Sequence, residues 1–142
     1  METVRRLGVG TRLPGLMTTI LLVDDDPLQA SLMVSLLGQR FGDVRRASDA
    51  SEALCLIEQR EFAGKLGLVI SGHHTRGIGQ TAFVAELHIR MPDLPVLVLD
   101  AADESAMHYT AEKVAYLAKP FGAEKILDLT SQMLADHKNT VV

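Results

Sequence analysis

Short apolar runs recur along this chain and alternate with stretches of helical periodicity. Four runs are strongly apolar, namely Ile20–Val23, Leu66–Ser71, Pro95–Leu99 and Ala115–Ala118, and a weaker one is Val44–Ala47. Continuous apolar runs are typical of parallel strands that are buried on both faces. Strands that alternate with helices form right-handed βαβ units. The sequence therefore predicts an α/β fold, a flavodoxin-like, doubly wound sheet of five parallel strands in the order 2-1-3-4-5, with α/β/α layering.

Capping residues and the spacing of apolar residues predict the helices. Asp26 is a suitable N-cap with Pro27 in the first helical position, and Asp49 with Glu52 is typical of a capping box. Further helices are expected over 81–90, 105–113 and 124–136, the one over 105–113 short and polar. The residues expected to face inward are Leu28, Leu32, Met33, Leu36 and Leu37, then Ala53, Leu54 and Ile57, then Phe83, Val84 and Leu87, and finally Ile126, Leu127, Met133 and Leu134.

Length and composition limit the classes of protein to consider. The 142 residues and the 47% hydrophobic content suit one globular domain. We expect a flexible extension over 1–17, the domain over 18–136 and a tail over 137–142. A net charge of −4 without a long basic run argues against a nucleic-acid surface. No apolar run approaches the roughly 18 residues of a membrane span. The single cysteine, Cys55, suits a reducing compartment, so we expect a cytoplasmic protein.

Charged residues follow two of the predicted strands. Asp24 and Asp25 come directly after the first strand, and Lys119 comes directly after the fifth. In a doubly wound sheet, ligands bind at the carboxyl ends of the strands. Mg²⁺ takes one or two carboxylates together with waters and phosphate oxygens, and a lysine can hold a phosphate oxygen. These residues therefore indicate either a phosphoryl-handling site or a self-neutralising cluster of ion pairs.

Two segments carry a resemblance to a known family. Residues 20–27 read Ile-Leu-Leu-Val-Asp-Asp-Asp-Pro, and residues 116–121 read Tyr-Leu-Ala-Lys-Pro-Phe. Both segments resemble the receiver domain of bacterial response regulators, and the resemblance extends over 18–136. It implies that Asp24 and Asp25 bind Mg²⁺ and that Lys119 contacts the phosphoryl group. It also implies a cis Lys119–Pro120 bond and an aromatic-switch role for Tyr116, for which a half-buried strand aromatic is the alternative interpretation.

The chain departs from the receiver pattern at several positions. Gly72 stands where the family has the phosphoacceptor aspartate, and His73-His74 begin the segment that usually follows the acceptor. Asp100 stands where the family has Thr or Ser, and the segment from there to Tyr116 is shorter than usual. Covalent phosphorylation of a carboxylate needs that carboxylate. The chain therefore resembles a degenerate receiver, a pseudo-receiver, in which we expect Asp100 to neutralise Lys119 as an ion pair.

The predicted function is that of a single-domain, non-enzymatic receiver in two-component (phosphorelay) signal transduction, acting through phosphorylation-independent protein contact. The expected partners are a histidine kinase, a phosphotransfer protein, a separate output protein or a second copy of the chain. Only weak Mg²⁺ binding is expected at the acid pair. A working phosphorelay receiver with Asp100, or less readily His73 or His74, as the acceptor is the main alternative.

Two other classes of site are alternatives to a receiver site. His73 and His74 could join the acid pair in a divalent-metal site suited to Zn²⁺. Adjacent histidines rarely face one ion, so this alternative is less favoured. A flavodoxin-type cofactor site is rejected, because three consecutive aspartates would repel a phosphate that lacks a cation.

Overall fold

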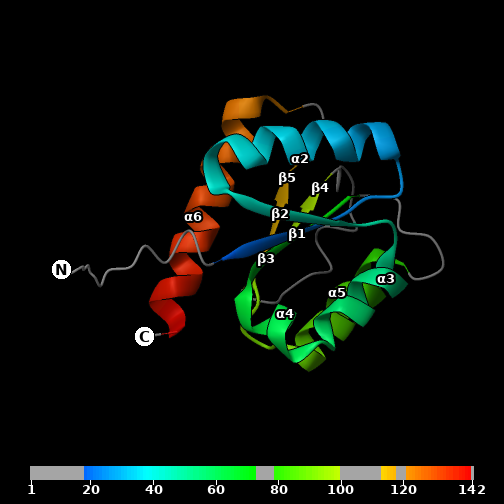
Figure 1. Ribbon diagram of the computed structural model, residues 1–142. Helices are drawn as coiled ribbons and strands as arrows, with labels where there is room; N and C mark the ends of the chain where they lie inside the picture. The colour runs from blue at the N-terminus through cyan, green and yellow to red at the C-terminus, as the bar shows by residue number, and fades with distance from the viewer. Residues whose placement is uncertain (1–17, 73–78, 100–112, 118–120, 142) are drawn as a thin grey trace.

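The fold is a single parallel sheet covered by helices on both faces (Figure 1). The computed structural model describes residues 18–72, 79–99, 113–117 and 121–141, with the side chains of the last helix described as far as residue 135. The strands are β1 (Thr19–Val23), β2 (Asp43–Ala47), β3 (Leu66–Ser71), β4 (Val96–Leu99) and β5 (Val114–Leu117). All neighbours are parallel and their order is β2-β1-β3-β4-β5. The predicted flavodoxin-like fold is therefore confirmed.

Two layers of helix enclose this sheet. The helices are α2 (Pro27–Phe41), α3 (Ala50–Ile57), α4 (Arg60–Lys65), α5 (Gln80–Arg90) and α6 (Ala123–Val141). In Figure 1, α2 and α6 cover one face, and α3, α4 and α5 cover the other. Helix α4 was not predicted from the sequence, and α6 continues past residue 136. The expected helix over 105–113 and the extension over 1–17 lie outside the described residues, apart from Lys113. No helix in the described segments combines the length and apolarity needed to span a membrane.

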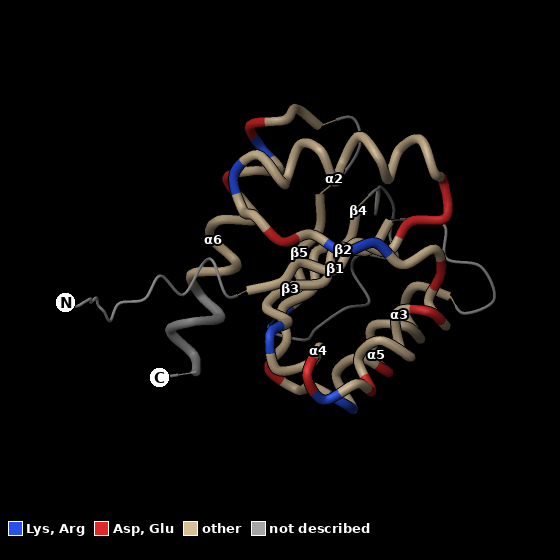
Figure 2. The backbone as a smooth tube through the Cα atoms, in the orientation of Figure 1, with Lys and Arg blue, Asp and Glu red and all other residues tan. Residues whose placement is uncertain are grey.

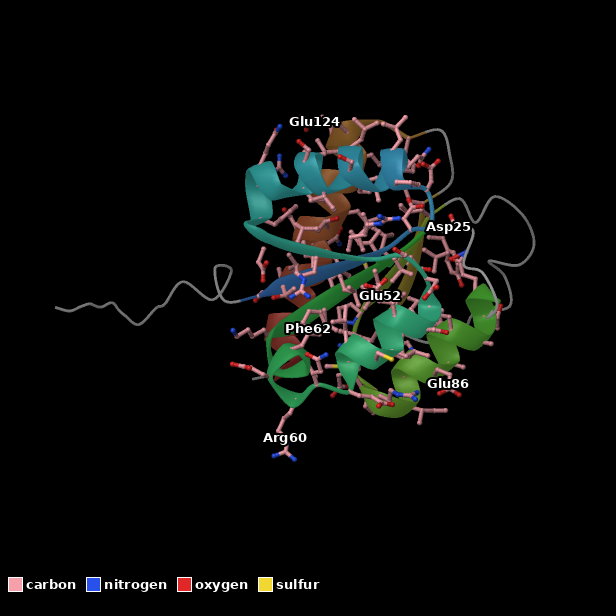
Figure 3. The ribbon with its side chains drawn as sticks, turned by 45° about the vertical axis from the view of Figure 1, so that its right-hand side comes forward. Asp25, Glu52, Arg60, Phe62, Glu86 and Glu124 are labelled. Carbon is pink, nitrogen blue, oxygen red and sulfur yellow. The ribbon has the colours of Figure 1, made fainter. Side chains whose placement is uncertain are left out.

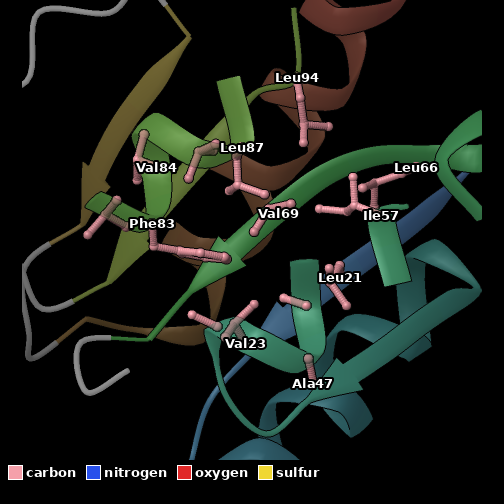
Figure 4. Close-up of a cluster of buried hydrophobic side chains, with 14 residues drawn as sticks. Leu21, Val23, Ala47, Ile57, Leu66, Val69, Phe83, Val84, Leu87 and Leu94 are labelled. Atoms are coloured by element: carbon pink, nitrogen blue, oxygen red, sulfur yellow. The ribbon is translucent and has the colours of Figure 1, made fainter. Parts of the chain in front are cut away.

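Each face of the sheet has its own hydrophobic core. Successive strand residues point to opposite faces, so Leu21 and Val23 pack towards α3 and α5, whereas Ile20 and Leu22 pack towards α2 and α6. Figure 4 shows the first of these cores. The inward faces predicted for α3, α5 and α6 are confirmed, with these residues buried or packed against the cores: Ala53, Leu54, Ile57, Phe83, Val84, Leu87, Ile126, Leu127, Met133 and Leu134.

The capping residues predicted for α2 and α3 are also confirmed. Asp26 Oδ1 accepts hydrogen bonds from the backbone N–H of Leu28 at 3.0 Å and of Gln29 at 3.3 Å. Asp49 Oδ1 accepts from the Glu52 N–H at 2.8 Å. The Glu52 carboxylate accepts in return from the N–H of Ser48 at 2.8 Å, one residue before the N-cap. These bonds satisfy backbone donors that a helix start leaves unpaired. The start of α2 is thereby held directly after the acid pair.

The buried face of α2 agrees only in part with the predicted one, since Met33, Leu36 and Leu37 contact the core as expected. Leu28 and Leu32 are 70% and 64% exposed, whereas Ala30 and Leu37 are completely buried. The helix carries apolar residues in two overlapping stripes, and the sheet contacts the stripe that contains the small Ala30. A small residue lets a helix approach the sheet closely, and Leu37 lies two turns further along the same face. The prediction of Leu28 and Leu32 as core residues was therefore wrong.

A bulge in β3 aligns that strand with β1. Thr19 pairs with Leu66 and Ile20 pairs with Leu68, so Gly67 is an extra residue between them. A Cβ atom at Gly67 would lie 2.3 Å from Thr18 Cγ2 and 3.3 Å from Leu134 Cδ2. Glycine at this position lets the two strands and α6 pack closely, and the strands then remain in register to their carboxyl ends.

Two leucines of α2 provide a test of its buried face. Leu37→Ala should lower the free energy of unfolding by about 2–5 kcal/mol, because it removes a buried side chain and leaves a cavity. Leu32→Ala is the matched control and should change it by no more than about 0.5 kcal/mol, as is usual at the surface. Urea unfolding followed by circular dichroism measures both values. Equal losses in the two variants would contradict the helix orientation described above.

Candidate functional site

The carboxyl ends of β1 and β3 meet at one edge of the sheet. The Gly72 N–H donates to the Val23 carbonyl oxygen at 2.8 Å, which places the residue after β3 directly beside the end of β1. Asp24 and Asp25 follow Val23 and are both half-buried. Figure 3 shows Asp25 at this edge, near the start of α2. The structure thus brings together three of the residues that the sequence analysis selected.

Asp24 is held through both its backbone and its side chain. Its N–H donates to the Ala47 carbonyl oxygen at 3.1 Å, which extends the pairing of β1 with β2 by one residue. Its Oδ1 accepts the Asp26 N–H at 2.9 Å, and this local bond turns the chain towards α2. The carboxylate therefore has a defined direction at the end of β1.

Arg46 is a site residue that the sequence analysis missed. Its Nε and Nη2 donate to the Asp24 carbonyl oxygen at 3.1 and 2.8 Å. Arg46 lies in β2 opposite Leu22 of β1, so its side chain reaches along the sheet to the residue after Val23. The available signal was an arginine one residue before the end of an edge strand, next to the strand that leads into the acid pair. That signal becomes usable only once the strand order is known.

Gly72 is buried and closely surrounded. A Cβ atom at this position would lie 3.1 Å from the Val23 carbonyl oxygen, 3.3 Å from Asp24 Cγ and 3.4 Å from Asp24 Oδ2. The Asp24 carboxylate thus lies against the position where a side chain of residue 72 would begin. The preceding residue, Ser71, is fully buried, and its Oγ lies 3.1 Å from Gln80 Oε1 at the start of α5.

Tyr116 lies in β5 and faces the side of the sheet that α3 and α5 cover. It pairs with Val98 of β4, packs against the core beneath α3 and α5, and has a buried hydroxyl oxygen. This position agrees with the alternative interpretation of a half-buried strand aromatic and leaves the switch role a prediction. The remaining candidates, His73, His74, Asp100 and Lys119, lie outside the described residues, as does the Lys119–Pro120 bond. The proposed Asp100–Lys119 ion pair is therefore still a prediction.

Comparison with known proteins identifies the family. The sequence profile of the response regulator receiver domain matches residues 20–131, so the chain belongs to the receiver domain family of two-component signalling proteins. No curated protein matches the chain.

Solved structures show the same fold. A response regulator receiver domain protein from Clostridium thermocellum is 20% identical, with a TM-score of 0.78, and the match covers 88% of this chain and 99% of that one. The signal receiver domain of an HD domain-containing protein from Pseudomonas fluorescens Pf-5 is 25% identical, with a TM-score of 0.76 and coverages of 86% and 98%. A CheY-like receiver domain protein from Methanospirillum hungatei JF-1 is 21% identical, with a TM-score of 0.76 and coverages of 87% and 98%.

The described residues provide only part of a magnesium site. Receiver domains typically bind Mg²⁺ at the phosphorylation site, and a hard cation of this kind prefers carboxylate oxygens. Within the segments that the structure describes, no three His, Cys, Asp or Glu side chains converge as metal ligands. Asp24 and Asp25 supply two carboxylates, and Gly72 supplies none. The described set therefore does not fit a three-carboxylate cation site.

Restoring a carboxylate at position 72 should make stability depend on magnesium. Without divalent ions, Gly72→Asp should destabilise the fold by about 1–3 kcal/mol, because its Cβ crowds Val23 and its charge faces the acid pair. Mg²⁺ at a hundred times its dissociation constant should raise the free energy of unfolding of Gly72→Asp by about 2.7 kcal/mol. Thermal unfolding with and without Mg²⁺ measures both effects. Gly72→Ala is the control, since it adds the Cβ alone, and an equal response of the two variants to Mg²⁺ would refute the expectation.

Proposed function

We propose that this chain is an atypical receiver that signals through protein contact without being phosphorylated. The observation that supports the proposal is Gly72, which occupies the buried end of β3 beside Asp24 and has no side chain to attack a phosphodonor. Receiver domains are generally non-enzymatic signalling modules, and we propose the same of this chain. We also propose that it works in the cytoplasm, and that the acid pair binds Mg²⁺ only weakly.

Receiver domains interact with kinases, phosphotransfer proteins and output proteins. Some of the structural matches are parts of longer chains: this chain covers only 52% of a probable response regulator/GGDEF domain protein. We propose that the partner of this receiver is a histidine kinase or a phosphotransfer protein. Self-association and a separate output protein are the alternatives.

The exposed leucines of α2 support a docking role for that helix. Leu28 and Leu32 are four residues apart, so their side chains lie on the same face of the helix and form a small apolar surface. This surface begins two residues after the Asp26 cap and therefore adjoins the edge that carries the acid pair. Burying two leucines against a partner helix is favourable by about 1.5–3 kcal/mol each. We propose that a helix of the kinase or phosphotransfer protein packs on this surface.

The absence of phosphorylation can be tested by intact-mass analysis. The full chain is incubated with Mg²⁺ and a small acyl phosphate, together with the variants Asp100→Ala and Gly72→Asp. The wild-type chain should gain no phosphoryl group, whereas Gly72→Asp should gain one if the rest of the site is competent. A wild-type adduct that disappears in Asp100→Ala would instead establish the phosphorelay alternative. An adduct that disappears only when His73 and His74 are both replaced would assign it to a histidine.

The docking surface can be tested with purified histidine-kinase dimerisation domains and phosphotransfer domains from the source organism. The double variant Leu28→Ala/Leu32→Ala should weaken binding by at least about tenfold, because it removes most of the apolar contact. Ile89→Ala is the matched control, since Ile89 is 72% exposed on α5 in the opposite helix layer. Calorimetry measures the affinities. Binding that is lost in Ile89→Ala and retained in the double variant would place the docking face elsewhere.

A further inference from the structure

Two consecutive arginines of β2 have different surroundings. The Arg45 side chain is exposed, and its guanidinium lies 5.5 Å from the centroid of the Phe62 ring. Arg46 is half-buried and points to the opposite face of the sheet, where it forms its two hydrogen bonds with the Asp24 carbonyl oxygen. Figure 2 shows this basic part of β2 beside the acidic turn that follows β1. Alternation along the strand therefore separates the roles of two identical residues.

The Arg46 guanidinium is fixed next to the acid pair. Two donors on one carbonyl oxygen define the orientation of the group, and a guanidinium stays charged at every physiological pH. The acceptor is the carbonyl oxygen of Asp24, and this carbonyl group is part of the peptide bond to Asp25. The positive charge therefore lies near the backbone of both acidic residues. A fixed cation that is bonded to the backbone between the two acidic residues lowers the local negative potential on which a divalent cation depends.

We propose that Arg46 is a positioning residue that supplies the fixed counter-charge of the acid pair and lowers its affinity for a divalent cation. The chain carries its own cation at the edge where the family typically binds Mg²⁺. Gly72 removes one anionic ligand from this edge, and Arg46 adds one positive charge to it. Both changes act in the same direction. The inference rests on the weak Mg²⁺ binding proposed above and gives that weakness a second cause.

The test compares Mn²⁺ affinity, measured by calorimetry on the full chain, among matched variants. Arg46→Gln keeps a donor amide and removes the charge, and it should tighten Mn²⁺ binding about tenfold. Arg45→Gln changes the net charge equally on the other face and should shift the affinity less than about twofold, because the charge of an exposed side chain is screened by solvent and salt. Arg46→Lys keeps the charge and should retain the wild-type affinity. Adding Asp25→Asn to Arg46→Gln should abolish the gain, which locates the ion at the acid pair.

Each outcome bears on one proposal. Equal affinities of Arg46→Gln and Arg45→Gln would overturn the role of Arg46. So would a tenfold gain in Arg46→Lys, since that variant loses the two-donor geometry and keeps the charge. If Arg46→Gln does not fold, Arg46→Met, which also removes the charge, is measured in its place and should show the same tightening. A wild-type Mn²⁺ affinity as high as that of Gly72→Asp would contradict the proposed weak binding of divalent cations at the acid pair. This result can be told apart from the two results that would overturn the role of Arg46.

Discussion

The complete burial of β1 is the constraint on which the rest of the structure depends. All five of its residues are at most 3% exposed, and the strand lies between β2 and β3. Its side chains contribute to both cores, so the two helix layers pack against opposite sides of the same strand. Apolar burial of this extent is the main favourable term in folding. The end of β1 is therefore held in place, and so is the start of the acid pair.

The candidate site inherits its geometry from this arrangement. Asp24 is bonded to Ala47 and Arg46 of β2, turns into α2 through the Asp26 N–H, and lies against Gly72 after β3. Three segments that are distant in the sequence thus determine the surroundings of one carboxylate. Position 72 contributes no carboxylate to this edge and Arg46 contributes a guanidinium, and both features support the proposal of signalling through protein contact.

Two comparisons show where prediction from the sequence failed and why. The apolar residues of α2 fit two overlapping stripes, and periodicity alone placed Leu28 and Leu32 on the buried face with Leu37, whereas the structure buries Ala30 with Leu37. The choice depended on how closely the helix approaches the sheet. Arg45 and Arg46 are adjacent residues of the same type, so the sequence pattern does not distinguish their roles. The roles differ because strand alternation places the two side chains on opposite faces of the sheet. By contrast, Asp24, Asp25 and Gly72 were correctly expected at one edge, because strand ends in a parallel sheet converge.

The sequence by itself determined the strands and the residues at their ends, and the match to the doubly wound arrangement predicted the strand order. These follow from local signals: continuous apolar runs, aspartates that cap the helices, and βαβ connections that cross over in one sense. Only the tertiary structure decided which face of α2 is buried, how tightly Gly72 is enclosed and which arginine serves Asp24. Those features depend on distances between segments far apart in the chain. Such distances are set by the packing of the whole core, which no local pattern encodes.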